Sequence, residues 1–188
     1  MPPTGESRAN FFTDLIKFSL VALLIVVPIR LYIAQPFIVS GDSMVPTFHN
    51  GEYLIVDEVS YRFEEPARGD VIIFRYPKDP SKYFIKRIIG LPGDTVALAN
   101  GTVTITNTEN PDGFVEHEPY LMDAQRTTER YTVALGEGEY FVLGDNRPAS
   151  SDSRSWGVLP EDNIVGRAFL RLLPIAHAAV LPGAPRAE

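Results

Sequence analysis

The chain of 188 residues contains no cysteine, which excludes disulfide frameworks, thiolate metal sites and cysteine nucleophiles. Clusters of basic residues are also missing: 17 Lys and Arg stand against 24 Asp and Glu, for a net charge of −7. Phosphate backbones are bound by concentrated positive charge, so no nucleic-acid partner is expected. No fixed-period repeat is present, and 16 prolines and 14 glycines are spread along the chain. This composition favours short strands and turns over long helices.

One long apolar run departs from this pattern, at Phe18–Ile29 between Lys17 and Arg30. As a helix, the wider stretch 15–34 would be about 30 Å long, enough to cross the hydrocarbon core of a bilayer. The two flanking cations would then reach the headgroups near its ends.

Three interpretations of this run compete. A buried helix of a soluble domain is disfavoured because residues 18–29 have no polar face. A cleaved signal peptide is disfavoured because no small-x-small site precedes Pro36. We therefore predict an uncleaved transmembrane signal anchor at residues 14–35, after an N-terminal tail at 1–13. The excess of basic residues before the core favours a cytoplasmic N-terminus, with the rest of the chain outside.

The remaining sequence predicts a mainly β protein. Short runs of β-branched and aromatic residues alternate with turn signals, and Asn100-Gly101 is typical of a type I′ hairpin turn. The predicted strands are 52–58, 70–76, 83–91, 95–98, 102–106, 131–134, 139–143 and 164–172.

We expect these strands to form an antiparallel, barrel-like domain over residues 36–174, in which 107–130 is a polar loop or small insertion. The apolar stretch 170–181 is short and interrupted, which disfavours a second membrane span. Residues 175–188 are therefore expected to be a tail on the protein surface or on the bilayer.

Ser43 is the first candidate for chemistry, in the segment Ser-Gly-Asp-Ser-Met-Val-Pro-Thr at 40–47. Gly41 permits an unusual backbone angle, and Pro46 stiffens the exit from the turn. Such a loop can aim a hydroxyl and a backbone N–H at one point, as acyl transfer requires. By itself the pattern is weak, because a serine in a glycine-containing turn is usually only part of the turn.

A nucleophilic serine needs a base, and His49, His117 and His177 are poor candidates because they fall in a turn, the polar insertion and the tail. Lys86 instead interrupts an apolar strand next to Arg87. Neighbouring side chains on a strand point to opposite faces, so one of these two faces the apolar side. Burial of Lys86 would lower its pKa and provide a neutral amine, but the pattern does not decide between them.

The third candidate element is the polar loop at 144–157, Gly-Asp-Asn-Arg-Pro-Ala-Ser-Ser-Asp-Ser-Arg-Ser-Trp-Gly. Its central serines can orient a lysine amine, and ion pairs between its aspartates and arginines would fix the loop. Asp145, Asn146 and Asp152 also provide oxygen ligands for a hard cation. The EF-hand spacing is missing and a salt-bridged scaffold explains the same residues, so we expect no metal site.

Taken together, these segments resemble bacterial type I signal peptidases, the serine/lysine-dyad protease family. The matching pieces are SGDSMVPT at 40–47, GDVIIFRYP at 69–77, KYFIKRIIGLPGD at 82–94 and GDNRPASSDSRSWG at 144–157. They occur in the order and at the spacings of the family, directly after the predicted anchor. The resemblance covers most of residues 14–170.

The resemblance implies a membrane-bound serine endopeptidase that removes signal peptides from exported preproteins at Ala-x-Ala-type sites, through an acyl-enzyme and without a cofactor. It implies a catalytic domain on the extracytoplasmic side of the cytoplasmic (inner) membrane, held there by the single-pass anchor. The expected partners are preproteins with signal peptides and the lipid bilayer, with the secretion translocon as a further candidate.

Residue by residue, the resemblance implies that Ser43 is the nucleophile and Lys86 the general base. Ser150 matches the serine that hydrogen-bonds and orients the lysine amine. The Ser43 backbone N–H is implied as an oxyanion donor. Gly41 stands where some relatives carry a second donor, a serine hydroxyl, so the hole would rest on backbone donors alone.

Further positions match supporting parts of the family's site. Asp152 and Arg154 match an ion pair that supports the site, and Asp145 belongs to the same structural loop. Four residues match walls of the substrate pocket in the family: Phe37, Val39, Phe48 and Ile85. The alternative is that they are ordinary residues of the hydrophobic core. The chain departs from some relatives at Asp42, where they have glycine, and at Pro148-Ala149, where they have a more polar pair.

Rival classes share some of these features. Gly41-Asp42-Ser43 also fits GDS-type esterases, but their Asp-x-x-His pair is missing, since Pro174 stands three residues before His177. Self-cleaving repressors use a similar serine/lysine pair but carry a DNA-binding domain and no anchor. A pilin-processing or conjugation-type peptidase would differ only in substrate. A tethered β domain that only binds extended peptides would keep the serine and the lysine for structural reasons.

Overall fold

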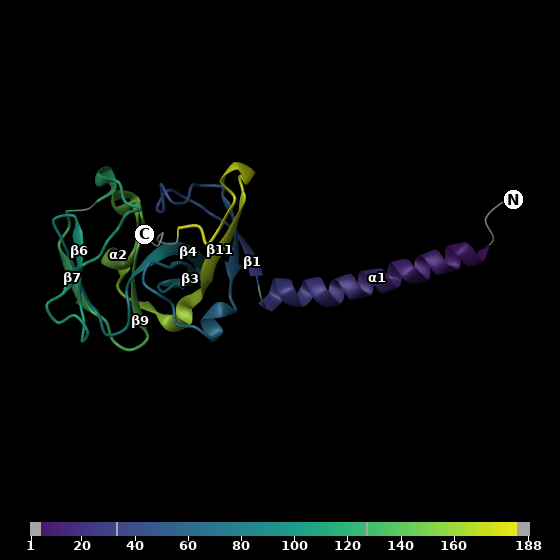
Figure 1. Cartoon of the computed structure of the whole chain (residues 1–188), viewed down its shortest axis with the longest axis horizontal. Coiled ribbons are helices and arrows are strands. Elements are labelled where there is room, and N and C mark those ends of the chain that lie inside the picture. The colour runs from purple at the N-terminus through teal and green to yellow at the C-terminus, as the bar shows by residue number, and fades with distance from the viewer. Residues whose placement is uncertain (1–4, 33, 127, 184–188) are drawn as a thin grey trace.

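The structure is a computed structural model that describes residues 5–32, 34–126 and 128–183. A long N-terminal helix projects from a β-rich body (Figure 1). The helices are α1 (Gly5–Tyr32), α2 (Ser153–Trp156) and the short 3-10 helices η1 (Ser60–Arg62), η2 (Asp123–Gln125), η3 (Arg147–Ala149), η4 (Glu161–Asn163) and η5 (Ile175–His177). The strands are β1 (Ala34–Ile38), β2 (Tyr53–Asp57), β3 (Val71–Tyr76), β4 (Asp79–Gly90), β5 (Thr95–Ala99), β6 (Thr102–Thr106), β7 (Phe114–Val115), β8 (Tyr131–Ala134), β9 (Glu139–Leu143), β10 (Leu159–Pro160), β11 (Ile164–Leu173) and β12 (Ala179–Val180).

The larger of two sheets carries apolar cores on both faces. Its strands are antiparallel, in the order β1-β2-β11-β3-β4-β9-β10, with β12 paired to β11. On β3, Val71 and Ile73 pack into one cluster, while Ile72 and Phe74 pack into another. A strand covered on both sides reads as a continuous apolar run, which is the pattern of this segment.

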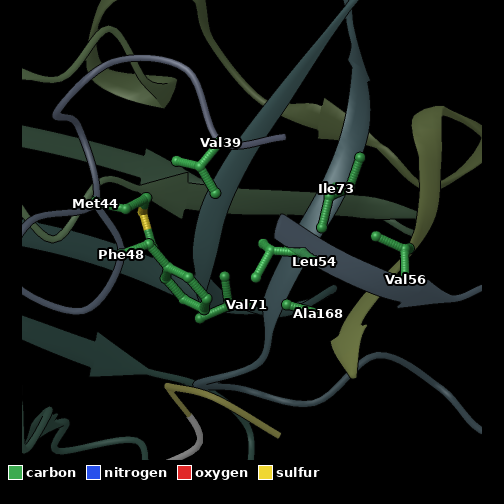
Figure 2. Close-up of a cluster of buried hydrophobic side chains, with 8 residues drawn as sticks. All are labelled: Val39, Met44, Phe48, Leu54, Val56, Val71, Ile73 and Ala168. Carbon is green, nitrogen blue, oxygen red and sulfur yellow. The ribbon is translucent and has the colours of Figure 1, made fainter. Parts of the chain in front are cut away.

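The first of these cores also holds the segment that follows β1. Val39, Met44 and Phe48 from that segment pack with residues of β2, β3 and β11 (Figure 2). Met44 and Phe48 are 1% and 0% exposed. The loop that contains Ser43 is therefore anchored in the core on its C-terminal side.

The smaller sheet has the strand order β7-β6-β5-β8 and lies at the end of the body away from α1 (Figure 1). Its hairpin turns at Asn100 and Gly101, whose φ angles of 51° and 82° are both positive, as the predicted turn requires. The predicted polar insertion at 107–130 connects β6 to β8 and contains β7 and η2.

All eight predicted strands are present, within a few residues at their ends. The prediction of a barrel-like domain is wrong, because the sheets do not close. Within the described ranges, the outer strands β1 and β10 each pair with one neighbour, β2 and β9. The physical reason is that β6 and β8 both pair with β5 in a separate sheet, so these strands do not extend the larger sheet toward closure.

The two ends of the chain differ in how they relate to the body. The predicted tail folds back onto it: β12 pairs with β11, and Pro182 is buried. The helix α1 covers most of the predicted anchor and ends at Tyr32, while Ala34 already belongs to β1. Among the described residues, no helix combines the length and apolar character needed to span a membrane. The transmembrane anchor at 14–35 stays a prediction.

Candidate active site

Ser43 lies in a tight turn between β1 and β2. Gly41 has a φ of 88°, in the left-handed region that favours glycine, and its N–H donates to the side-chain oxygen of Asn50 at 3.0 Å. The residues after Ser43 enter the core, so its hydroxyl is half-buried at the edge of the body. The turn and the core together fix where this hydroxyl lies.

Lys86 reaches Ser43 from β4. Its Nζ donates to Ser43 Oγ at 2.8 Å and to the backbone carbonyl of Ile85 at 2.8 Å. The side chain is only 4% exposed. Burial lowers the pKa of Lys86 to about 8, an effect that the negative charges of Asp152 and Asp145 partly oppose. A neutral amine is therefore accessible near neutral pH, within hydrogen-bonding distance of a hydroxyl.

Arg87 is buried as well, on the opposite face of the same strand. It is 0% exposed, and its Nε and Nη2 bind the two carboxylate oxygens of Asp145 at 2.9 and 2.6 Å. Its Nη1 donates to the Gly69 carbonyl at 2.8 Å. The sequence pattern could not choose between Lys86 and Arg87 because both faces of β4 are covered here.

The polar loop at 144–157 is held by a buried ion pair. Asp152 is 0% exposed and accepts hydrogen bonds from Arg154 Nε at 2.8 Å and Arg154 Nη2 at 2.9 Å. The backbone N–H of Gly144 donates to the same carboxylate at 3.1 Å. The expected pair of Asp152 and Arg154 is thus present, and it closes the loop onto its own first residue.

This loop is joined directly to the turn that carries the serine. The Asn146 backbone N–H donates to the Ser43 carbonyl at 2.9 Å, and its side-chain amide donates to the Asp42 carbonyl at 3.0 Å. The Thr47 hydroxyl donates to Asp145 at 2.5 Å. Asp145 therefore links Arg87 and the serine segment, as well as belonging to the polar loop.

Ser150 is close to the site, but it does not make the expected hydrogen bond to Lys86. Its Oγ is buried without a hydrogen-bond partner among the described residues. It packs against Gly144, where an added Cβ would lie 2.2 Å from Ser150 Oγ and 2.4 Å from the Ser43 carbonyl oxygen. The Lys86 amine is oriented by the Ile85 carbonyl instead. A catalytic role for Ser150 stays a prediction.

A cleft of about 460 Å³ opens beside Ser43 and Lys86. Three of the four predicted wall residues, Phe37, Val39 and Ile85, line it. The expectation for Phe48 is wrong, because its ring is fully buried in the core shown in Figure 2 and does not line the cleft. The core alternative holds for that residue, since the chain turns inward after Met44.

The other candidate residues, the histidines and the loop carboxylates, lie as follows in the described part of the chain. The three histidines do not line the cleft, and His49 Nδ1 instead lies 3.8 Å from a carboxylate oxygen of Glu52. No group of three acidic or histidine side chains able to hold a metal occurs among the residues that the structure describes. Asp145 and Asp152 each bind an arginine.

Sequence reasoning missed the contribution of the insertion at 107–130. Glu118 is buried and binds Arg147 of the polar loop, and Gln125 donates to the Val45 carbonyl at 2.9 Å. Polar residues in a loop-like segment carry no local signal for such contacts. Gly144 was also overlooked, although a glycine at the start of a crowded polar loop was a usable hint of close backbone approach.

Fold and site define a β-rich protein with a serine hydroxyl and a buried lysine amine in contact beside an apolar cleft, an arrangement suited to acyl transfer. The chain belongs to the family described as signal peptidase, peptidase S26, whose family model matches residues 12–173. The resemblance to type I signal peptidases predicted from the sequence is thereby confirmed.

Two relatives agree with this assignment through their sequences. The chain is 38% identical to Probable signal peptidase I-1 of Synechocystis sp., over 89% of this chain and 86% of that protein. It is 35% identical to Signal peptidase I T of Bacillus subtilis, over 91% of this chain and 90% of that protein. A crystal structure of a signal peptidase I from Enterococcus faecalis V583 matches with a TM-score of 0.47 and 32% identity, over 55% of this chain and 97% of that one.

Proposed function

We propose that this protein is a serine endopeptidase that removes N-terminal signal peptides from exported preproteins, with Ser43 as nucleophile and Lys86 as general base. The observation that carries the proposal is the 2.8 Å contact between the Ser43 hydroxyl and a lysine amine that is 4% exposed. Membership of the signal peptidase family supports the choice of substrate class.

Acylation begins with a proton transfer. Neutral Lys86 accepts the proton of Ser43 Oγ as this oxygen attacks the scissile carbonyl carbon. The backbone N–H of Ser43 is placed in this proposal as a donor to the oxyanion that develops. The Lys86 ammonium then protonates the leaving amine, which releases the new N-terminus of the mature protein and leaves the signal peptide esterified to Ser43.

Deacylation uses the same base. Lys86 takes a proton from a water molecule, the resulting hydroxide attacks the ester carbonyl, and Ser43 Oγ recovers its proton as the signal peptide leaves. The Ile85 carbonyl accepts a hydrogen bond from the amine, which keeps Nζ directed at the hydroxyl in both halves of the reaction.

The substrate is proposed to bind as an added strand beside β4. Within the described residues, β9 pairs with β4 only from Arg87 to Gly90, so residues 83–86 have a strand partner, β3, on one side alone. Phe37, Val39 and Ile85 face the same cleft. An extended peptide could hydrogen-bond to this free edge while small Ala-x-Ala-type side chains fit the shallow apolar walls.

The proposal also includes the membrane. Residues 14–35 are proposed to hold the protein as a single-pass anchor in the cytoplasmic membrane, with the body on the extracytoplasmic side, near emerging preproteins and the secretion translocon. The described apolar side chains of α1 support this, because Phe18 and Leu24 are 74% and 76% exposed and find no cover on the body. Such exposed apolar surface favours contact with lipid.

The deciding experiment compares full-length wild type with Ser43→Ala and Lys86→Met in detergent, on a precursor with an Ala-x-Ala site. Cleavage is expected from wild type and loss of at least about a thousandfold in both variants, because nucleophile and base act as a unit. Lys78→Met, which removes an exposed lysine close to β4, is the matched control and is expected to cleave normally. Near-normal activity of Lys86→Met would refute the assigned base, and a wild type that binds the precursor without cutting it would favour the peptide-binding alternative.

A further inference from the structure

Three side chains of one short stretch of the insertion, residues 118–125, contact three separate parts of the site. The Glu118 carboxylate binds Arg147 of the polar loop. The ring centroid of Tyr120 lies 3.8 Å from the guanidinium carbon of Arg87, next to Lys86 on β4. Gln125 Nε2 donates to the carbonyl of Val45, two residues after Ser43, at 2.9 Å. These partners are distant from one another in the sequence.

We propose that residues 118–125 are a positioning segment for the site, and that Gln125 is the residue through which it holds the serine loop. This inference rests on the proposed function, because it assigns the segment a role toward Ser43 as nucleophile. It gives the insertion at 107–130 a purpose that neither its composition nor its loop-like sequence reveals.

The side-chain amide of Gln125 is fixed at both ends by hydrogen bonds. Its side chain is 7% exposed, and its Oε1 accepts the Met122 backbone N–H at 3.0 Å while Nε2 reaches Val45. With both ends of the amide bonded, the side chain cannot rotate without leaving a buried polar group unpaired. The position of the Val45 carbonyl is therefore tied to η2.

The remaining ties on the serine loop come from other elements. Asn146 bonds to the carbonyls of Asp42 and Ser43, and the Thr47 hydroxyl bonds to Asp145. The Val45 carbonyl lies between these points, and Gln125 holds it from a different part of the chain. A misplacement of a reacting group by about 1 Å can lower a rate by roughly a hundredfold. The hydrogen bond from Gln125 to this loop therefore matters for turnover.

The other two contacts extend the same role to the rest of the site. Arg147, which Glu118 binds, donates from its Nε to the Gly144 carbonyl at 3.0 Å, next to the crowded contact of Gly144 with Ser150. Tyr120 covers the guanidinium of Arg87, whose neighbour in the chain is the lysine. One segment thus contacts the surroundings of nucleophile, base and polar loop.

Gln125→Glu and Gln125→Met in the full-length protein test the role of the hydrogen bond from Gln125 to Val45. The glutamate variant keeps the acceptor for the Met122 N–H and the side-chain shape, but it loses the donor to Val45. The methionine variant keeps only the shape. Two readouts are needed: kcat and KM on the precursor, and hydrogen–deuterium exchange of a peptide covering residues 40–48.

Both variants are expected to lower kcat by about tenfold with KM changed less than about twofold, because loop placement affects the reacting hydroxyl more than the cleft. Exchange in 40–48 is expected to rise by about tenfold, while β5 and β6 exchange as in wild type. Glu109→Gln, at an exposed position of the same insertion, and Ile105→Val, in the core of the smaller sheet, are the matched controls.

Unchanged exchange in residues 40–48 would overturn the role of Gln125, whatever the activity. The role would also be overturned if Ile105→Val had the same melting temperature as the Gln125 variants and lost as much kcat as they do. Lowered stability alone would then explain the loss of activity. If the wild type cleaves no precursor, the proposed function fails, and the exchange data still decide whether Gln125 holds the loop.

Discussion

At the scale of single residues, the site depends on two adjacent cations that are buried in different ways. The buried guanidinium of Arg87 makes a bidentate contact with the Asp145 carboxylate, which replaces hydrogen bonds that it would otherwise make to water. Lys86 has no carboxylate in hydrogen-bonding contact among the described residues, and its amine bonds to a hydroxyl and a carbonyl instead. An ammonium in such surroundings gives up its proton more readily, which is what a general base needs.

The pH profile of kcat/KM follows from this arrangement. In the proposed mechanism the base works in its neutral form, and burial lowers the pKa of Lys86 to about 8. Activity should therefore rise by about tenfold per pH unit below pH 8 and level off above it. Precursor cleavage measured from about pH 6 to about pH 9.5 checks this, with precursor binding followed separately over the same range. A flat profile through pH 8 would show that titration of Lys86 does not limit the reaction.

At the scale of elements, the site is assembled from a turn, a strand and a loop that are distant from one another in the sequence. The turn at 40–47 meets the polar loop through backbone carbonyls of Asp42 and Ser43, and both meet β4 through Asp145. The two also approach closely at Gly144, where the absence of a side chain lets the loop lie against the serine backbone. The distance between Ser43 and Lys86 is therefore set where these elements touch.

Gly144→Ala should damage catalysis more than folding. The new methyl group would lie 2.2 Å from Ser150 Oγ and 2.4 Å from the Ser43 carbonyl oxygen, so one or both would move. We expect kcat to fall by about a hundredfold, the loss associated with a displacement of about 1 Å. Cleavage kinetics and thermal unfolding of the same preparation provide the measurement.

Gly136→Ala is the matched control for this substitution. A Cβ at Gly136 would meet the flexible carboxylate of Glu139 at 3.2 Å, which can move aside. That variant should cleave at the wild-type rate. If Gly144→Ala also cleaved at that rate, the contact at Gly144 would have no part in positioning Ser43.

At the scale of the whole molecule, α1 and the body are largely separate parts (Figure 1). The helix projects away from the sheets and meets them next to β1 (Figure 1). The cleft lies within the body and is lined by residues from Phe37 onward. Cleavage and attachment to the membrane can therefore be tested separately. In the proposed function, α1 serves only the attachment.

Extraction of membranes at alkaline pH tests that assignment. The full-length protein should remain in the membrane pellet, because the exposed apolar side chains of α1 would be removed from water there. A variant without residues 1–32 should move to the supernatant. If the full-length protein were extracted as completely as this variant, the anchor at 14–35 would be refuted, while the serine/lysine mechanism would be unaffected.

Local patterns predicted much of the body correctly. The eight strands were readable because β-branched and aromatic runs end at turn signals, and the turn at Asn100-Gly101 follows from the tolerance of both residues for positive φ. The edge strand β1 was missed because it contains Pro36 and directly follows the apolar run. Proline is compatible with an edge strand, but it weakens the sequence signal of one.

The sequence by itself determined most of the longer strands and, through its resemblance to the family, the residues proposed to take part in the chemistry: Ser43, Lys86 and those of the polar loop. Only the tertiary structure decided that both Lys86 and Arg87 are buried, that Phe48 belongs to the core, that Ser150 faces Gly144, and that the insertion reaches the site through Gln125. The reason is physical. Strand periodicity and turn conformation arise from neighbours in the chain, whereas burial, pKa and the contact between Ser43 and Lys86, 43 residues apart, arise from how distant segments pack.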